Sequence, residues 1–126
     1  MRKEKRLAKV IENISNNINR LSKGNPNPPR LLHEIQFSGP AVICVNGENV
    51  YTPHGETMLS EYKKLSSDVI DEDDYLTMYR LAYLKDVLFI DDNIKSCGFY
   101  LSYTIPSNNC KYLRLLLEKL QKLQSA

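Results

Sequence analysis

The sequence predicts an α+β fold with a small antiparallel sheet built from two β-hairpins, at about residues 41–52 and 87–103. We expect helices packed on one face of the sheet and amphipathic helices at both termini. Apolar residues recur with helical spacing near both ends of the chain. Asn46-Gly47 and Asp91-Asp92-Asn93 each separate two short apolar runs, which is typical of hairpins. Hairpins combined with helices indicate the α+β class.

The first predicted helix covers residues 3–22. Its apolar residues alternate spacings of four and three, which forms a heptad-like seam. The seam consists of Leu7, Ile11, Ile14, Ile18 and Leu21. Gly24 is a natural stop, and the proline-rich stretch after it cannot form a helix or a central strand.

The middle of the chain is predicted to begin with a hairpin, because Asn-Gly suits the positive φ angles of a tight turn. Its strands cover about residues 41–45 and 49–52, and a helix follows at 56–66. The acidic run 71–74 favours a helix starting at Tyr75, since carboxylates are stabilised at a helix N-terminus.

That helix is expected to end at Leu84, before a strand at 87–90 and a returning strand at 97–103. A Leu-rich helix at 110–124 completes the chain. With 126 residues, we expect a single domain. It would join an N-terminal basic amphipathic helix, residues 1–23, through a Pro-rich linker, 24–30, to an α+β core of residues 31–109.

Charge is sorted along the chain. Residues 1–30 carry eight cationic and two acidic side chains, whereas residues 31–109 carry five cationic and twelve acidic ones. Residues 110–126 carry four cationic side chains and one acidic. The overall charge of +2 therefore conceals two basic ends around an acidic middle, and such regions select different partners.

The terminal helices and a tyrosine stripe are the candidate interface for self-association or partner docking. Three uses of the apolar seams stay open: packing within the chain, homo-oligomerisation, and docking into a partner's groove. Tyrosines spaced by four residues suit either a half-buried face or a binding surface. The candidate residues are Leu7, Ile11, Ile14, Ile18, Leu21, Tyr75, Tyr79, Tyr83, Leu113, Leu116, Leu117 and Leu120.

The N-terminal cations are candidates for nucleic-acid contact, because clustered cations neutralise phosphates. They are Arg2, Lys3, Lys5, Arg6 and Lys9. No aromatic residue is interleaved with them, so stacking on single strands is not supported there. The same residues also suit a solvated helix face.

The sequence indicates no catalytic constellation, metal site or cofactor. The acidic run 71–74 lacks the spacing of a calcium loop, and no phosphate-binding glycine loop is present. Three cysteines without close spacing suit free thiols in a reducing compartment. No long apolar run follows the basic N-terminus, so we expect a cytoplasmic, or nuclear, protein that is not secreted and makes no membrane contact.

The leading hypothesis is a non-enzymatic protein-interaction or accessory protein, an adaptor, regulator or inhibitor of viral, phage or host origin. Its partners would be itself, as a homodimer, and another protein, with no small-molecule substrate evident. The alternative is a nucleic-acid-binding regulator that uses the N-terminal basic helix. A metal-dependent nuclease or hydrolase is the remote alternative, because scattered carboxylates offer hard oxygen ligands.

Overall fold

The computed structural model describes residues 3–23, 40–45, 48–90 and 108–125. These residues are mostly helical, with a small two-stranded antiparallel sheet, which is consistent with the α+β class. In chain order the elements are α1 (Lys3–Ser22), β1 (Val42–Val45), β2 (Glu48–Tyr51), α2 (Pro53–Ser66), α3 (Tyr75–Val87) and α4 (Lys111–Ser125).

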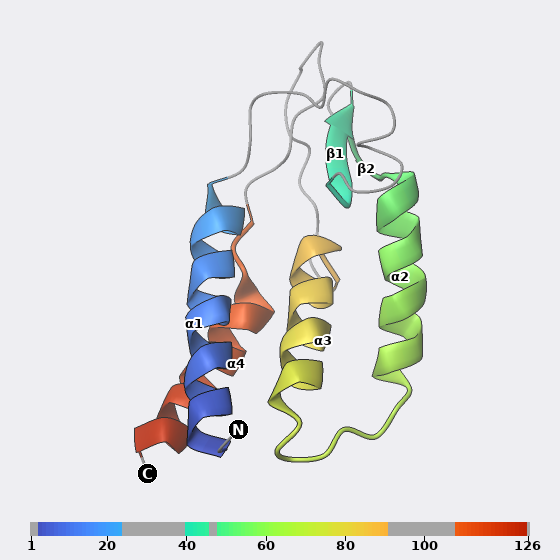
Figure 1. Ribbon diagram of the computed structural model, residues 1–126. Helices are drawn as coiled ribbons and strands as arrows, with labels where there is room; N and C mark the ends of the chain where they lie inside the picture. Colours follow the sequence, from blue (N-terminus) through green and yellow to red (C-terminus); the bar gives the residue numbers. More distant parts are fainter. Residues whose placement is uncertain (1–2, 24–39, 46–47, 91–107, 126) are drawn as a thin grey trace.

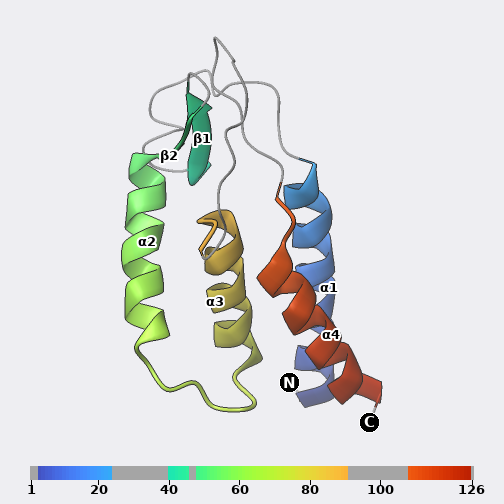
Figure 2. The same ribbon diagram turned by 180° about the vertical axis from the view of Figure 1, so that it is seen from behind.

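The helices lie lengthwise side by side, and the β-hairpin sits at one end of them (Figure 1). α1 begins and α4 ends at the opposite end, where the loop between α2 and α3 also turns. Seen from behind, α4 crosses the surface that α1 and α3 form together (Figure 2). The basic terminal helices are therefore neighbours in space, and the acidic α2–α3 region lies beside them.

A first hydrophobic core joins α1, α3 and α4. The seam of α1 enters it, and Ile14 has an exposed fraction of 0%. The buried members are Leu7, Val10, Ile14, Ile18, Tyr75, Ala82, Cys110, Leu113 and Leu120. α1 and α4 thus bury their apolar stripes within one chain, as amphipathic helices of globular proteins do.

A second core joins the hairpin to α2 and α3. Thr52 caps α2, because its side-chain oxygen accepts the N–H of Gly55 at 2.9 Å. The backbone N–H of Thr52 also donates to the Ala41 carbonyl at 2.9 Å, which ties the start of α2 to the residue before β1. Glycine is required at position 55, because a Cβ there would lie 2.1 Å from that carbonyl oxygen. Tyr51 ties the sheet to the end of α3 by donating its hydroxyl to the Leu88 carbonyl at 2.6 Å.

The first predicted hairpin is confirmed. β1 and β2 pair antiparallel, from Val42 opposite Tyr51 to Val45 opposite Glu48. The predicted helix at residues 3–22 has the predicted bounds. The Asn46-Gly47 turn, the linker 24–30 and the strand at 97–103 lie outside the described residues.

The predicted strand at 87–90 is wrong. α3 continues to Val87 and ends in a Schellman motif: Phe89 N–H donates to the Asp86 carbonyl at 3.1 Å, and Ile90 N–H donates to the Lys85 carbonyl at 2.9 Å. Phe89 holds the left-handed position, with φ 55°, where glycine is usual. The apolar run 87–90 resembles a strand because no glycine marks the end of the helix.

Candidate functional site

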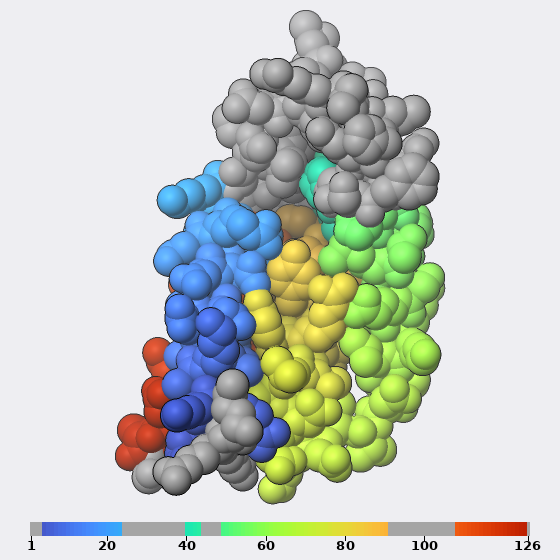
Figure 3. Space-filling model, viewed as in Figure 1, coloured from blue at the N-terminus to red at the C-terminus, as the bar shows by residue number. Residues whose placement is uncertain are grey.

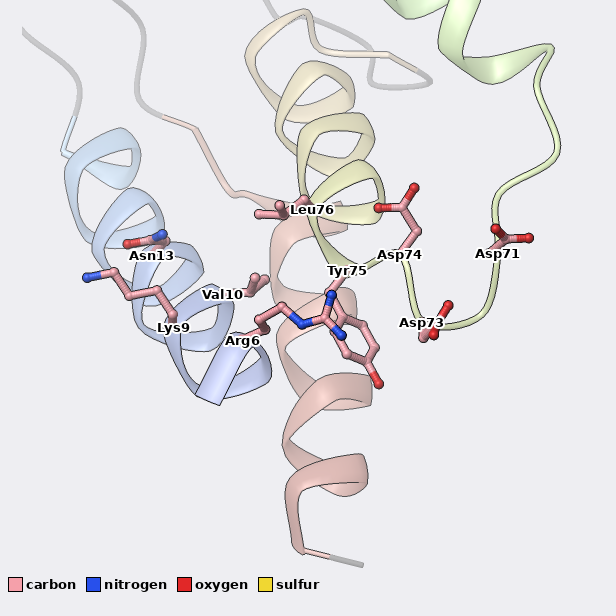
Figure 4. Close-up of a pocket in the computed structure, with 9 residues that line it drawn as sticks. All are labelled: Arg6, Lys9, Val10, Asn13, Asp71, Asp73, Asp74, Tyr75 and Leu76. Carbon is pink, nitrogen blue, oxygen red and sulfur yellow. The ribbon is translucent and has the colours of Figure 1, made fainter. Parts of the chain in front are cut away.

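A groove lies between the first turns of α1 and the start of α3 (Figure 4). Its volume is about 500 Å³, within the usual range for ligand pockets. In the space-filling view, the dark blue surface of α1 adjoins the yellow-green surface at the start of α3 here (Figure 3). The lining residues are Arg6, Lys9, Val10, Asn13, Asp71, Asp73, Asp74, Tyr75 and Leu76.

The α1 wall of the groove is cationic. Arg6, Lys9 and Asn13 are three or four residues apart, which places them on one side of the helix. Arg6 and Lys9 are exposed, and neither side chain makes a hydrogen bond or ion pair with any residue that the structure describes. Both charges are therefore available to a ligand.

The opposite wall is acidic and comes from the loop before α3. Asp74 caps α3: its carboxylate accepts the Thr77 N–H at 3.2 Å and the Thr77 hydroxyl at 2.7 Å. Asp71 accepts the Asp74 N–H at 3.1 Å through its backbone carbonyl. The carboxylates of Asp71 and Asp73 have no partner among the described residues. Only one of the three acidic side chains is thus used to hold the loop.

The floor between the two walls is apolar. Val10 is 2% exposed and Tyr75 is 7% exposed, because both also belong to the first core. Leu76 is 67% exposed, so most of this apolar side chain is accessible to a ligand beside the buried Val10 and Tyr75. Burying such a side chain under a ligand would contribute about 1.5–3 kcal/mol.

Farther along the same two helices, polar contacts hold α1 and α3 together. Asn17 donates its side-chain N–H to the Tyr79 hydroxyl, and Arg20 donates to the Tyr83 hydroxyl at 3.4 Å. Burial raises the pKa of Tyr79 above its ordinary value. The groove is therefore limited to the N-terminal halves of the two helices.

At the far end of the cluster, a buried polar junction joins α1, α3 and α4. The Asp86 carboxylate accepts the N–H groups of Tyr112 at 3.0 Å and Leu113 at 2.7 Å, and so caps α4 from another helix. The Asn108 side chain donates to the Asp86 carbonyl at 2.6 Å. The Asn108 N–H donates to the Leu21 carbonyl at 3.1 Å. These bonds fix the relative position of the three helices.

Cys110 lies in this junction in the left-handed region, with φ 53°. Its N–H donates to the side-chain oxygen of Asn108 at 2.9 Å, which holds the turn into α4. Burial, together with the charge of Asp86, raises the pKa of the thiol to about 11. The thiol is therefore protonated and unreactive at neutral pH.

All twelve candidate interface residues lie in or against the first core. Leu7, Ile14, Ile18, Tyr75, Leu113 and Leu120 are buried in the first core. The others pack partly against it: Ile11, Leu21, Tyr79, Tyr83, Leu116 and Leu117. Packing within the chain, one of the three uses left open for the seams, accounts for these contacts.

The candidate nucleic-acid residues separate into two groups. Arg6 and Lys9 line the groove, whereas Lys5 is exposed on α1 outside it. Arg2 and the side chain of Lys3 lie outside what the structure describes.

Sequence reasoning missed the rest of the groove. The carboxylates of the acidic run 71–74 suggest hard oxygen ligands in the sequence, but their position opposite Arg6 and Lys9 depends on how α1 packs against α3. Within the described ranges, no three His, Cys, Asp or Glu side chains gather closely enough to hold a metal ion. Among the described helices, none is both long and apolar enough to cross a membrane.

No protein-family model, curated protein or solved structure matches this chain.

Proposed function

We propose that the protein is a non-enzymatic protein-interaction module, which binds a segment of a partner polypeptide in the groove between α1 and α3. The observation that carries the proposal is the exposed Leu76 on an apolar floor between two oppositely charged walls. An apolar centre with a polar rim is the usual composition of a protein-binding surface.

The groove chemistry favours binding over catalysis. Among the described residues that line it there is no serine, threonine, cysteine or histidine, so this part of the groove holds no Ser–His or Cys–His nucleophile pair. Arg6 and Lys9 can form ion pairs with carboxylates of a ligand, and Asp71 and Asp73 can form ion pairs with its cationic groups. A polypeptide readily presents both charges beside an apolar side chain, and such rim charges mainly set specificity and the association rate.

Nucleic-acid binding is the second candidate. The observation that favours it is the exposure of three cationic side chains, Lys5, Arg6 and Lys9, on the first turns of α1. The acidic wall argues against it, because the carboxylates of Asp71 and Asp73 would face the phosphates that approach Arg6 and Lys9.

Selection from a displayed library of random peptides tests the leading proposal. Enriched peptides are synthesised, labelled and titrated with the protein by fluorescence anisotropy. We expect Leu76→Lys to weaken their binding at least about tenfold, since it removes the apolar centre of the site. The matched control is Leu115→Lys on α4, because Leu115 is 56% exposed and lies outside the groove. We expect the control to bind like the unmodified protein.

Two results would overturn the proposal. The first is that no enriched peptide distinguishes Leu76→Lys from the unmodified protein. The second is that the protein binds labelled duplex DNA, single-stranded DNA or RNA at about 50 mM salt through phosphate contacts. Such binding would be lost at about 200 mM salt, and it would also be lost in the Lys5→Gln, Arg6→Gln, Lys9→Gln triple variant. That second result would make the nucleic-acid candidate the leading one.

A further inference from the structure

We propose that the occupant of the groove is a short amphipathic helix of a partner protein, with an apolar ridge between one acidic and one basic flank. This inference rests on the proposed function and specifies the chemistry of the partner. The groove has three kinds of surface, and each would meet one part of the helix.

The cationic wall defines the acidic flank of the partner. Arg6 and Lys9 stand about one turn apart on α1 and both line the groove. In Figure 4 the Arg6 side chain extends toward the start of α3, whereas the Lys9 side chain extends away from it along the outer side of α1. Arginine suits a carboxylate because its guanidinium donates two parallel hydrogen bonds. Glutamate or aspartate residues spaced by three or four positions on the partner helix would meet this wall.

The acidic wall defines the basic flank. The side-chain carboxylates of Asp71 and Asp73 have no partner among the described residues, whereas the Asp74 carboxylate is bonded to Thr77. Two carboxylates are therefore available for lysine or arginine side chains. Long cationic side chains can reach them from a helix while their own apolar stems cover Leu76.

The three-part arrangement favours a helix over an extended strand. A strand presents only two faces, because successive side chains point in opposite directions. A helix presents residues all around its axis, so an apolar ridge can stand between two differently charged flanks. Helix-in-groove binding of this kind is a common mode of peptide recognition.

The dimensions of the groove suit about two turns of helix. Arg6 to Asn13 covers two turns of α1, which is about 10 Å along the helix axis. Beyond Asn13, the bonds from Asn17 to Tyr79 and from Arg20 to Tyr83 close the space between α1 and α3. The partner helix would therefore contact the protein through about eight residues and one or two apolar anchors.

A panel of three designed peptides tests the inference by fluorescence anisotropy. Each is a helix-stabilised peptide of about 16 residues with the same leucine ridge. One carries a glutamate flank and a lysine flank, the second carries glutamate on both flanks, and the third carries lysine on both. We expect the unmodified protein to bind the mixed peptide about three- to tenfold more tightly than either of the others, because each wall contributes two charge pairs at the rim.

Charge-reversal variants make the test specific for each wall. The Arg6→Glu, Lys9→Glu variant should prefer the peptide with two lysine flanks, and the Asp71→Lys, Asp73→Lys variant should prefer the peptide with two glutamate flanks. The matched control for the Arg6→Glu, Lys9→Glu variant is Lys5→Glu, Lys119→Glu, which lowers the net charge by the same amount at exposed positions outside the groove. We expect the control to keep the preference of the unmodified protein.

Failure of this inference is distinguishable from failure of the proposed function. If the panel shows no preference, or if the variants do not switch preference, while library-selected peptides still depend on Leu76, the helical, two-flank partner is wrong and the proposed function stands. If no peptide of either kind depends on Leu76, both are wrong. Sedimentation at increasing protein concentration shows whether a second copy occupies the groove instead, since Leu76→Lys would then lower the mass.

Discussion

The cluster formed by α1, α3 and α4 has polar side chains at both of its ends, and the two ends use them differently. At the end near Leu21, the Asp86 carboxylate and the Asn108 side chain are buried and bonded to backbone groups of other elements. At the end near Arg6, the charged side chains are exposed, and most make no bond within the described residues.

We expect this difference to separate the residues that stabilise the fold from the residues proposed to bind a partner. Buried polar groups must be bonded, since an unsatisfied one costs about 1–3 kcal/mol. Exposed charges cost little to leave unbonded, and they remain available for a partner. We therefore expect substitutions at the junction to change the free energy of unfolding, and substitutions at the groove to change binding.

The largest expected effect concerns the shared core between the two ends. Ile14→Asp places a carboxylate at a fully buried position, so it should unfold the protein or lower the free energy of unfolding by more than about 4 kcal/mol. Circular dichroism melting and sedimentation measure the outcome. Ala8→Asp, at an exposed position of the same helix, should cost less than about 1 kcal/mol. A folded Ile14→Asp variant with an unchanged melting temperature would exclude the seam from the core.

The next effect compares one aspartate from each end. Asp86→Ala removes the acceptor of two N–H groups at the start of α4, so it should lower the free energy of unfolding by about 2–4 kcal/mol in urea denaturation. Asp73→Ala at the groove should change the free energy of unfolding by less than about 0.5 kcal/mol. Equal losses for the two variants would contradict the difference between the ends.

The smallest effect concerns α2, which is outside the cluster. Arg80 donates two hydrogen bonds to Glu61, at 2.6 and 2.8 Å, and these bonds lower the pKa of Glu61 below its ordinary value. The ionised Glu61 side chain is therefore favoured in the folded protein. Its contribution to the free energy of unfolding is fully present above the pKa that Glu61 has in the unfolded chain. That contribution is lost as the pH falls through the lower pKa of the folded protein. The pair is exposed, and its worth is about 0.2–1 kcal/mol.

The Glu61→Gln variant checks this contribution. Urea denaturation should show that it is less stable than the unmodified protein at pH 7, and that the difference shrinks when pH falls to about 3. A difference that is equal at the two pH values would mean that the charge of Glu61 does not stabilise the fold.

Local patterns in the sequence predict the elements well. Apolar residues spaced by three and four positions predict the observed bounds of α1. The prediction is correct because the apolar stripe of α1 faces one core along the whole helix. Asn46-Gly47 in the sequence predicts a hairpin here, and β1 and β2 pair antiparallel as expected. In both places, residues close together in sequence decide the structure.

The end of α3 and the groove depend on less local causes. Leu84, Val87 and Leu88 keep helical spacing and enter the second core, but Phe89 stops the helix in a conformation that favours glycine. The sequence identifies Arg6 and Lys9 as candidates for binding. It does not show that Asp73 lies across from them, because that proximity requires α1 to pack against α3.

One pair of measurements on the Arg6→Glu, Lys9→Glu variant tests the central claim, that the charged groove is built for binding and not for stability. We predict a free energy of unfolding within about 0.5 kcal/mol of the unmodified protein. We also predict at least about threefold weaker binding of the mixed-flank peptide. A loss of more than about 1 kcal/mol in stability, or unchanged binding of that peptide, would contradict the account.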